Sequence, residues 1–438
     1  MTQSNKPFTL ASLFSGCGGM DLGFEGGFTV HKSALTTTER QKITSTGKNG
    51  FVKLEELPFQ TDFACDVAPK AMRAWNRFFG HKRSVEGVFN CRSIVDIVKE
   101  IQAGDSTAPK RFDVVTGGFP CNDFSVAGKR LGFKSNKSHR GNGQKTSGDD
   151  NPTAENRGML YYWMREFIAA VKPKVFYAEN VKGLVSLGDA RDIITNDFQN
   201  IPGHPYFVLP VRVLRAIDYG VAQSRERVIF IGLKRSALKP NIITHIEKTG
   251  DLPRELDLYP TQSHGDASLE CQNPLRFSTC GDVFSGLAEP DESADLSQQR
   301  YSMAKHMGTH VQGQREVRID APGPTIRAEH HGNIEFRRLS RKMGGQNIQE
   351  LQQGLKQRRL TVRECARLQT FPDNYEFVVP GELSPSDGYR LIGNAVPPLL
   401  AYRLAQQLAD KWGDLFRDSS PTVAKPAKQS RQATVVQG

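Results

Sequence analysis

A cysteine that directly follows a predicted strand is the residue of this chain best suited to covalent chemistry. The stretch Arg111–Ser125, RFDVVTGGFPCNDFS, contains a short apolar run that predicts a buried parallel strand ending at Gly117 and Gly118. Pro120 then restricts the backbone, so Cys121 stands on a stiff turn. In open α/β sheets, chemistry gathers beyond the carboxyl ends of the strands. Cys121 is therefore a candidate nucleophile, although a free cysteine can also be a small buried apolar residue.

A carboxylate and two arginines are predicted to reach the same edge of the sheet. Residues 172–184, KPKVFYAENVKGL, predict a strand that delivers Glu179 there. A carboxylate at a strand end is often an ion-pair or capping residue, but beside a thiol it can also act in catalysis. Arg225 and Arg227 follow in an extended segment, and their spacing predicts that both side chains point to one face. Such alternation is also common on solvated surfaces.

The first two predicted strands carry the marks of a nucleoside-binding sheet. The strand Phe8–Phe14 is followed by SGCGGMDLGFE, in which Gly16 and Gly18 allow a tight turn and close approach of a ligand. Asp21 replaces the third glycine of the dinucleotide-binding pattern, which argues against a nicotinamide dehydrogenase. The second strand, TDFACD, ends in Asp66. An acidic residue there can hold ribose hydroxyls or cap the following helix.

The composition favours a partner that carries negative charge. The 438 residues include 58 Lys and Arg against 47 Asp and Glu, which gives a net charge of +11. The 7 cysteines form an odd number without small-scaffold spacing, as expected for free thiols in a reducing cytoplasm. We find no signal-peptide pattern and no apolar run long enough to cross a bilayer. The sequence thus predicts a soluble intracellular protein without a membrane partner.

Residues 234–358 differ from the rest of the chain in their hydrophobic pattern and in the distribution of their charges. Their hydrophobic periodicity is weak and their basic residues are clustered, which predicts a separate, less regular domain. Four side chains of this part, Cys271, Cys280, His306 and His310, could form a zinc site, but no C-x-x-C pair anchors one. We therefore expect no bound metal.

Other segments predict particular local structures. Residues 31–61 form a polar stretch typical of an inserted hairpin or surface loop, and residues 134–157 a polar loop that would serve as a lid. Residues 359–371 predict an amphipathic helix that starts near Thr361. The stretch GYRLIGNAVPP predicts a loop before a C-terminal helix, and residues 417–438 a disordered tail.

In the order of its motifs, the chain resembles the DNA (cytosine-5) methyltransferases. The resemblance runs through nearly the whole length, in FSGCGGMDLGFE, GGFPCNDFSVAGKR, ENVKGL, QSRER, RRLTVRECARLQTFPD and GYRLIGNAVPP. The sequence departs from the family at Asn122, where glutamine is usual, and at Asn90, where an aspartate usually contacts the adenine. The resemblance implies an α/β fold with a mostly parallel, Rossmann-like methyltransferase sheet and a smaller, irregular target-recognition domain.

The resemblance also implies a covalent mechanism. Cys121 would add to C6 of a cytosine and so activate C5 toward the methyl group. Glu179 would supply a proton at N3, and Arg227, with Arg225 beside it, would stabilise O2. The cytosine must leave the duplex for this chemistry, so it would be flipped out.

The cofactor and DNA sites follow from the same resemblance. S-adenosylmethionine is the implied methyl donor. Its expected ligands are Phe14, Gly16, Gly18, Asp66, Asn90 and Asn394. Guanine edges of the DNA would be read by a few cations, for which we consider Arg327, Arg337 and Arg338.

We expect the catalytic domain to span residues 1–236 and to be completed by residues 386–416, with residues 237–385 as the target-recognition domain. The expected function is methylation of C5 of a cytosine within a specific double-stranded DNA sequence. The enzyme would be a monomer of the bacterial cytoplasm, associated with the nucleoid, and a separate cognate restriction endonuclease would accompany it. Two alternatives remain open at this point, a transfer RNA cytosine-5 methyltransferase and a catalytically silent DNA-binding relative.

Overall fold

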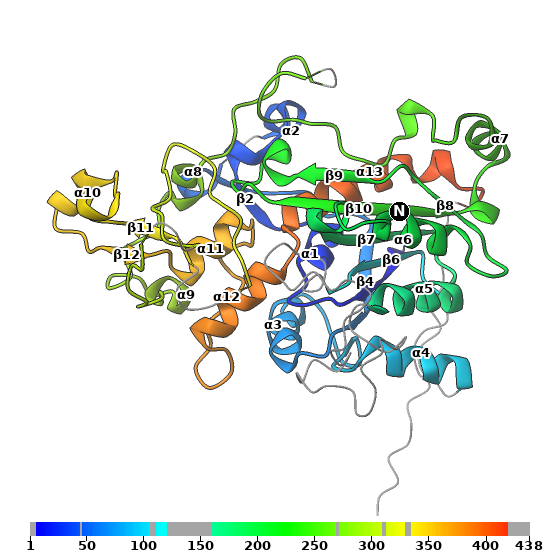
Figure 1. The fold of residues 1–438 in the computed structure, drawn as a ribbon, viewed down its shortest axis with the longest axis horizontal. Helices are drawn as coiled ribbons and strands as arrows, with labels where there is room; N and C mark the ends of the chain where they lie inside the picture. The colour runs from blue at the N-terminus through cyan, green and yellow to red at the C-terminus, as the bar shows by residue number, and fades with distance from the viewer. Residues whose placement is uncertain are drawn as a thin grey trace, which may run out of the picture.

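A mostly parallel sheet forms the centre of the molecule (Figure 1). The structure is a computed structural model that describes residues 6–43, 46–104, 111–120, 159–268, 271–308, 312–328 and 334–418. Within these ranges the main sheet has the strand order β5-β4-β1-β6-β7-β10-β8, with β9 paired to β10. Its strands are β1 (Phe8–Leu13), β4 (Phe59–Cys65), β5 (Phe89–Asn90), β6 (Val114–Gly118), β7 (Val175–Val181), β8 (Tyr206–Val208), β9 (Arg212–Arg215) and β10 (Glu226–Lys234).

The strands from β5 to β7 are parallel, so their carboxyl ends meet at one edge. Strand β1 pairs in parallel with β4 on one side and β6 on the other. Strand β6 ends at Gly118, opposite Glu179 of β7, which confirms the strand predicted before Pro120. Strand β10 is antiparallel to β7, β8 and β9, so the sheet is mixed at this side. The predicted α/β class is confirmed.

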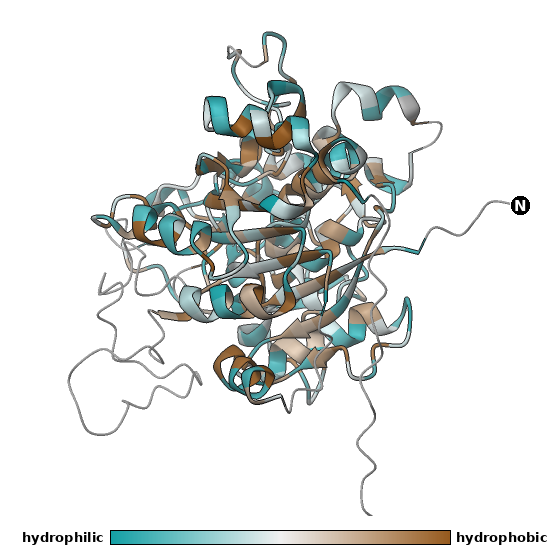
Figure 2. Cartoon of the chain, turned by 90° about the vertical axis from the view of Figure 1, so that its right-hand side faces the viewer, coloured by the Kyte–Doolittle hydropathy of each residue, from teal (hydrophilic) through white to brown (hydrophobic). Residues whose placement is uncertain are grey.

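Helices cover both faces of the sheet because neighbouring strand residues point to opposite sides. On β7, Tyr177 belongs to one buried apolar cluster and Phe176 to the other. In Figure 2 the brown, hydrophobic residues gather on the strands and on the helix faces turned toward them. The Tyr177 cluster packs against α1 (Gly19–Glu25), α3 (Pro69–Gly80) and α13 (Pro398–Leu415). The Phe176 cluster packs against α4 (Ile94–Ala103), α5 (Leu160–Val171) and α6 (Ala190–Gln199).

The predicted inserted hairpin is present. It connects the sheet to the less regular domain predicted for residues 234–358, which we call the irregular part. It comprises β2 (Thr29–His31), α2 (Thr37–Lys42) and β3 (Phe51–Lys53), with β2 antiparallel to β3. Ser33 Oγ donates to Ser278 Oγ at 3.0 Å, and the His264 ring nitrogen Nε2 lies 2.8 Å from the Ser33 carbonyl oxygen. Burial lowers the pKa of His264 to about 4, so this ring is neutral at physiological pH. The insertion therefore fixes the two parts to each other.

The irregular part consists of short elements, as its weak hydrophobic periodicity predicts. These are α8 (Cys280–Phe284), α9 (Leu296–Gln299), β11 (Phe336–Arg338), α10 (Ile348–Gln352) and β12 (Arg358–Arg359). The helix α11 (Val362–Leu368) begins after Thr361 as expected, but all of its residues are buried, so the prediction of an amphipathic helix is wrong. Most of the stretch GYRLIGNAVPP, which was expected to be a loop, forms the last part of helix α12 (Pro385–Asn394).

The helix α7 (Pro240–Thr249) packs on the sheet side of the molecule, not on the irregular part. Tyr259 Oη donates to the Ile229 carbonyl of β10 at 2.8 Å, and Lys239 N donates to the Leu415 carbonyl at 2.9 Å. The chain thus keeps its contacts with the sheet part beyond residue 237, as far as about residue 259. No helix of the described ranges has the length and apolar character of a membrane span. The expected tail falls almost entirely on residues 419–438, outside the described residues.

Candidate active site

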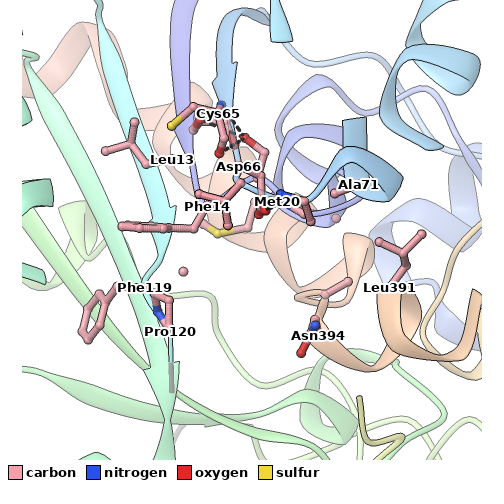
Figure 3. A pocket seen from close by; sticks show the side chains of 18 of the residues that line it. Leu13, Phe14, Met20, Cys65, Asp66, Ala71, Phe119, Pro120, Leu391 and Asn394 are labelled. Atoms are coloured by element: carbon pink, nitrogen blue, oxygen red, sulfur yellow. Dashed lines mark hydrogen bonds between the residues drawn. The ribbon is translucent and has the colours of Figure 1, made fainter. Parts of the chain in front are cut away.

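A cavity of about 540 Å³ opens at the carboxyl ends of β1, β4, β6 and β7. Its walls come from segments far apart in the sequence, including the turn after β1, the end of β4 and the end of α12 (Figure 3). The residues expected from the sequence that line it are Phe14, Gly16, Asp66, Glu179, Arg227 and Asn394. The sheet thus brings together residues expected to act on a base and residues expected to hold a cofactor.

Glu179 and Arg227 form an ion pair on the wall of this cavity. Arg227 Nε lies 2.6 Å from Glu179 Oε1, and each side chain is only about a tenth exposed. The pair follows from the register, since Arg227 lies opposite Val181 and Glu179 opposite Ile229 on the two antiparallel strands. The backbone of Gly118 also approaches, because a Cβ on this glycine would lie 2.9 Å from Glu179 Oε2. The carboxylate is therefore held in one place, with a guanidinium directly beside it.

The turn that leads to Cys121 lies at the same cavity. Cys121 itself, with Asn122, is outside the described residues, as is the expected lid 134–157. Pro120 lines the cavity, and Phe119 is buried next to Tyr161. The Asn180 side chain donates to the Phe119 carbonyl at 3.0 Å, so the residue after Glu179 fixes the backbone just before the cysteine.

Asp66 links the end of β4 to the glycine turn. Its Oδ2 accepts from Gly16 N at 3.0 Å, and its Oδ1 accepts from Ala68 N at 2.9 Å. Burial raises the pKa of the Asp66 carboxyl, although the backbone donors act in the opposite direction. The carboxylate lines the cavity and keeps free lone pairs, because each oxygen can accept more than one hydrogen bond. Asp66 therefore orders the turn and can still accept from a ligand.

Replacing Asp66 with alanine should weaken cofactor binding roughly ten- to a hundred-fold, the usual effect of losing a hydrogen bond to a charged group. Calorimetric titration with S-adenosylmethionine measures this, and Asp66→Asn should lose less because it keeps one acceptor. Asp62→Ala is the matched control, since Asp62 lies on the same strand outside the cavity. Unchanged cofactor affinity in Asp66→Ala would show that Asp66 only caps the backbone.

The turn after β1 has a backbone shape that few residues adopt. Phe14 has φ 53° and Gly16 has φ 54°, and a left-handed conformation is costly for a bulky residue such as Phe14. No atom lies within 4 Å of the position that a Cβ on Gly16 would occupy, so this glycine faces open space in the cavity. Gly18 differs, because a Cβ there would lie 2.6 Å from the Trp75 ring. Gly18 thus serves the packing of α3 and does not line the cavity.

Two other expected residues lie away from the cavity. Arg225 is 1% exposed and donates to the carbonyl of Ile326 at 2.9 Å and to that of Gly393 at 2.8 Å. It does not share a face with Arg227, because it turns into the junction between the sheet and the irregular part. Asn90 is not part of the cavity wall either. Its amide donates to the Val88 carbonyl at 3.2 Å, which is a local contact at the edge strand.

The arginines expected to read DNA form ion pairs within the irregular part. Arg338 is 1% exposed, and its Nη1 donates to Glu289 Oε2 at 3.1 Å. Arg337 donates to Glu350 at 2.8 Å, and Arg327 to Glu335 at 3.1 Å. Burial alone would raise the pKa of Glu289, but hydrogen bonds from Arg338 and Arg358 outweigh it and hold that pKa below its ordinary value. Arg338 is thus a structural residue, and the basic cluster around it is largely neutralised.

Arg338→Ala should lower the free energy of unfolding by about 3 kcal/mol, because it leaves buried carboxylates without one of their partners. Thermal denaturation measures the loss. Arg341→Ala is the control, since Arg341 is exposed and should leave the melting temperature unchanged. A stable Arg338→Ala variant with altered DNA sequence preference would restore the reading role to this residue.

Several residues of the cavity wall had no signal of their own in the sequence. Lys70, Arg92 and Ser93 line it from the α3 and α4 sides, and Arg390 from α12. Arg390 lies inside the GYRLIGNAVPP motif, which would have pointed to it. Ser93 caps α4 by accepting from Val95 N, so only its S-x-x-D pattern marks it in the sequence.

The comparisons with known proteins identify the class. The family model of the C-5 cytosine-specific DNA methylases matches residues 48–140 and 145–410. This is well over half of the chain, so the chain belongs to that family. The enzyme transfers a methyl group from S-adenosylmethionine to C5 of cytosine in DNA.

Individual relatives are bacterial type II methyltransferases. M.NgoFVII of Neisseria gonorrhoeae is 30% identical over 424 residues, which cover 95% of this chain and 90% of that protein. M.BspRI of Lysinibacillus sphaericus is 29% identical, with 96% of this chain and 86% of that protein covered. Among solved structures, the Entamoeba histolytica methyltransferase EhMeth matches with a TM-score of 0.52 at 15% identity, covering 93% of this chain and 99% of that one. This last likeness concerns the fold alone.

The cavity fits S-adenosylmethionine. Gly16 leaves a cradle that any side chain would fill, and Asp66 offers acceptors for the ribose hydroxyls. Phe14 and Leu391 give apolar walls, and the exposed Asn394 amide completes the rim. When bound, the cofactor supplies the methyl group. Among the described residues, no group of His, Cys, Asp and Glu is placed to hold a metal, and His310 lies outside them.

Proposed function

We propose that this chain is the modification enzyme of a type II restriction–modification system and that it methylates one cytosine of a specific duplex sequence through a Cys121–C6 adduct. The observation that carries this proposal is the Glu179–Arg227 pair, which lies in the cavity beside the turn that leads to Cys121. The type II character comes from the printed names of the relatives.

The pair suits the charge that develops on the base. When the Cys121 thiolate adds to C6, electron density moves toward N3 and O2 of the ring. Glu179 supplies a proton at N3, and the Arg227 guanidinium donates to O2. C5 then carries enamine character and takes the methyl group, and S-adenosylhomocysteine is the leaving group. A base removes the C5 proton, the C5–H electrons re-form the C5–C6 double bond and expel the Cys121 thiolate from C6, and the N3 proton returns to Glu179.

The remaining ligands support the two substrates. Phe14, Gly16, Asp66 and Asn394 hold the cofactor. Arg225 acts indirectly, since it fixes the backbone at Gly393, next to Asn394. We assign the catalytic part to residues 1–259 and 386–416, and target recognition to residues 260–385.

The partners follow from the same assignment. We propose that the enzyme acts as a monomer on double-stranded DNA of the bacterial nucleoid, in the cytoplasm. A separate endonuclease would cut the same sequence when it is unmethylated. Methylation of this sequence in the host DNA protects the host DNA from being cut by that endonuclease.

Bisulfite mapping of DNA from cells that express the protein tests this function. Cytosines within one short sequence should resist conversion by bisulfite. In DNA from the empty-vector strain, the cytosines of that sequence should all be converted. DNA from these cells should also resist the one endonuclease that cuts that sequence. Methyl incorporation into transfer RNA, with none into DNA, would overturn the proposal.

A further inference from the structure

Exposed methionines are concentrated in the irregular part. Among the described residues, five large apolar side chains are exposed. Three are methionines of this part, Met303 (80% exposed), Met307 (52%) and Met343 (37%), and the other two are Val67 and Ile193 of the catalytic part. Single exposed apolar side chains are ordinary, whereas several on one face can mark a contact surface. Methionine is also unbranched and adaptable, which suits it to contact surfaces.

Exposure alternates along the segment that carries the first two methionines. Met303, Lys305 and Met307 are exposed, whereas Ala304 and His306 between them are partly buried. A period of two is that of an extended chain, in which successive side chains point to opposite sides. Met303, Lys305 and Met307 therefore share one face, which we call the Met-Lys-Met face.

A buried arginine fixes the backbone beneath this face. Arg359 is 1% exposed and donates to the Ala304 carbonyl at 2.8 Å and to the Lys305 carbonyl at 3.1 Å. It also donates to the Gly313 carbonyl at 2.7 Å, and its guanidinium lies 4.0 Å from the centre of the Phe336 ring. The hydrogen bonds from Arg359 thus hold the backbone of this segment in place, so its exposed side chains have a defined position.

The face adjoins a second cavity, of about 480 Å³, between the irregular part and the sheet. Met307 N donates to Gln314 Oε1 at 2.9 Å, and the neighbours of Gln314, Gly313 and Arg315, line that cavity. Ser224 lines it from the opposite side, just before the strand that carries Arg227. The segment that carries the Met-Lys-Met face is therefore bonded to the wall of this second cavity.

Two exposed cations lie on the face and on the wall of the adjoining cavity, which also carries the carboxylates of Glu316 and Glu335. Lys305 and Arg315 are exposed. The short 3-10 helix Arg341–Met343 is also exposed, and Asn347, four residues after it, donates from its backbone N to Glu316 of the cavity wall at 2.9 Å. Exposed cations beside apolar side chains are suited to contact the phosphates of DNA while the apolar side chains contact the bases.

We propose that the Met-Lys-Met face enters a groove of the target duplex, where Lys305 contacts a phosphate and Met303 and Met307 make apolar contacts with base edges. This proposal rests on the proposed function and adds to it the residues that read the sequence. Phosphate contacts bind all sequences alike, whereas apolar contacts with base edges discriminate between them. Sequence preference is thus assigned to the methionines and general affinity to the lysine.

The test uses the full-length protein with S-adenosylhomocysteine and two duplexes, one with the mapped target sequence and one with that sequence scrambled. Met303→Ala/Met307→Ala should bind the target duplex at least tenfold more weakly and the scrambled duplex within twofold of wild type. Lys305→Ala should weaken both equally, about threefold, and reduce the slope of affinity against salt by about one ion. Ile193→Ala is the matched control, since it truncates an exposed apolar residue of the catalytic part.

The longer, polar pair Met303→Gln/Met307→Gln repeats the test with side-chain length kept, in case the alanine pair is unstable. A ratio of target to scrambled affinity that stays within twofold of wild type in the methionine variants overturns the inference. A change in oligomeric state with an unchanged ratio also overturns it, and would assign the face to a contact between two copies. A wild-type protein that methylates no DNA would instead refute the proposed function.

Discussion

Cys121→Ala should abolish methyl transfer, with a loss in kcat of about 10⁴-fold or more, the scale of effect expected when a catalytic nucleophile is removed. The physical reason is that C5 of cytosine is a poor nucleophile until a thiolate has added to C6. Single-turnover transfer of labelled methyl groups to a duplex with the target sequence measures the effect. A duplex with 5-fluorocytosine at the target should form a covalent adduct with wild-type protein and none with the variant.

The binding steps should survive this change, which separates loss of chemistry from loss of structure. Cofactor affinity and duplex affinity of Cys121→Ala should stay close to the wild-type values. Cys91→Ala is the matched control, because Cys91 is a partly exposed cysteine near the cofactor side of the sheet and should keep full activity. Substantial methylation by Cys121→Ala would refute the covalent mechanism.

Glu179→Gln should lower kcat by about 10²- to 10⁴-fold and leave the KM for DNA nearly unchanged. Glutamine keeps the shape of the side chain and a hydrogen bond at N3, but it cannot transfer a proton. The 2.6 Å pair with Arg227 would also lose its charge, so the guanidinium would be less firmly placed. The double variant Glu179→Gln/Arg227→Met should therefore lose less than the sum of the two single losses, since both residues act on one developing charge.

Steady-state kinetics with kcat and KM determined separately decide the role of Glu179. The control is Glu226→Gln, because Glu226 adjoins Arg227 but pairs with Lys182 at the surface. Equal losses in Glu179→Gln and Glu226→Gln would indicate a general weakening of the sheet edge. A loss confined to KM would make Glu179 a substrate-binding residue without a part in proton transfer.

The sheet and the cavity could be predicted because their signals are local. A short β-branched run followed by a glycine or proline turn defines a buried strand wherever it occurs, and parallel strands bring their ends together. Asp66, Glu179 and Asn394 lie in different motifs, yet each lies at the end of an element and so reaches the same edge. The helix α12 also has a local signal, since Ser384 and Asp387 form a capping box that marks the start of a helix. The expected loop at GYRLIGNAVPP did not take this capping box into account.

The roles of the arginines could not be predicted, because they depend on distant partners. Arg338 pairs with Glu289, 49 residues away, and Arg225 donates to Gly393, 168 residues away. Nothing in the basic clusters distinguishes an arginine paired with a buried carboxylate from one that faces DNA. For the same reason the Met-Lys-Met face has no mark in the sequence, since it becomes visible only from the exposure of each side chain.

The cofactor cavity is lined by two segments, residues 12–20 and 387–396, that are synthesised at very different times. Cys17 Sγ lies 3.5 Å from the Leu391 carbonyl, 374 residues further along, and Gly23 of α1 fits closely against Ala401 of α13. Before α13 has been made, the side of α1 that carries Gly23 has no helix to cover it, whereas Phe24 already has its partners Phe59 and Tyr177 in the sheet. An uncovered helix face of this kind favours aggregation during folding. A chain interrupted before α12 also lacks Leu391 and Asn394 of the cavity wall, so its cofactor site is incomplete.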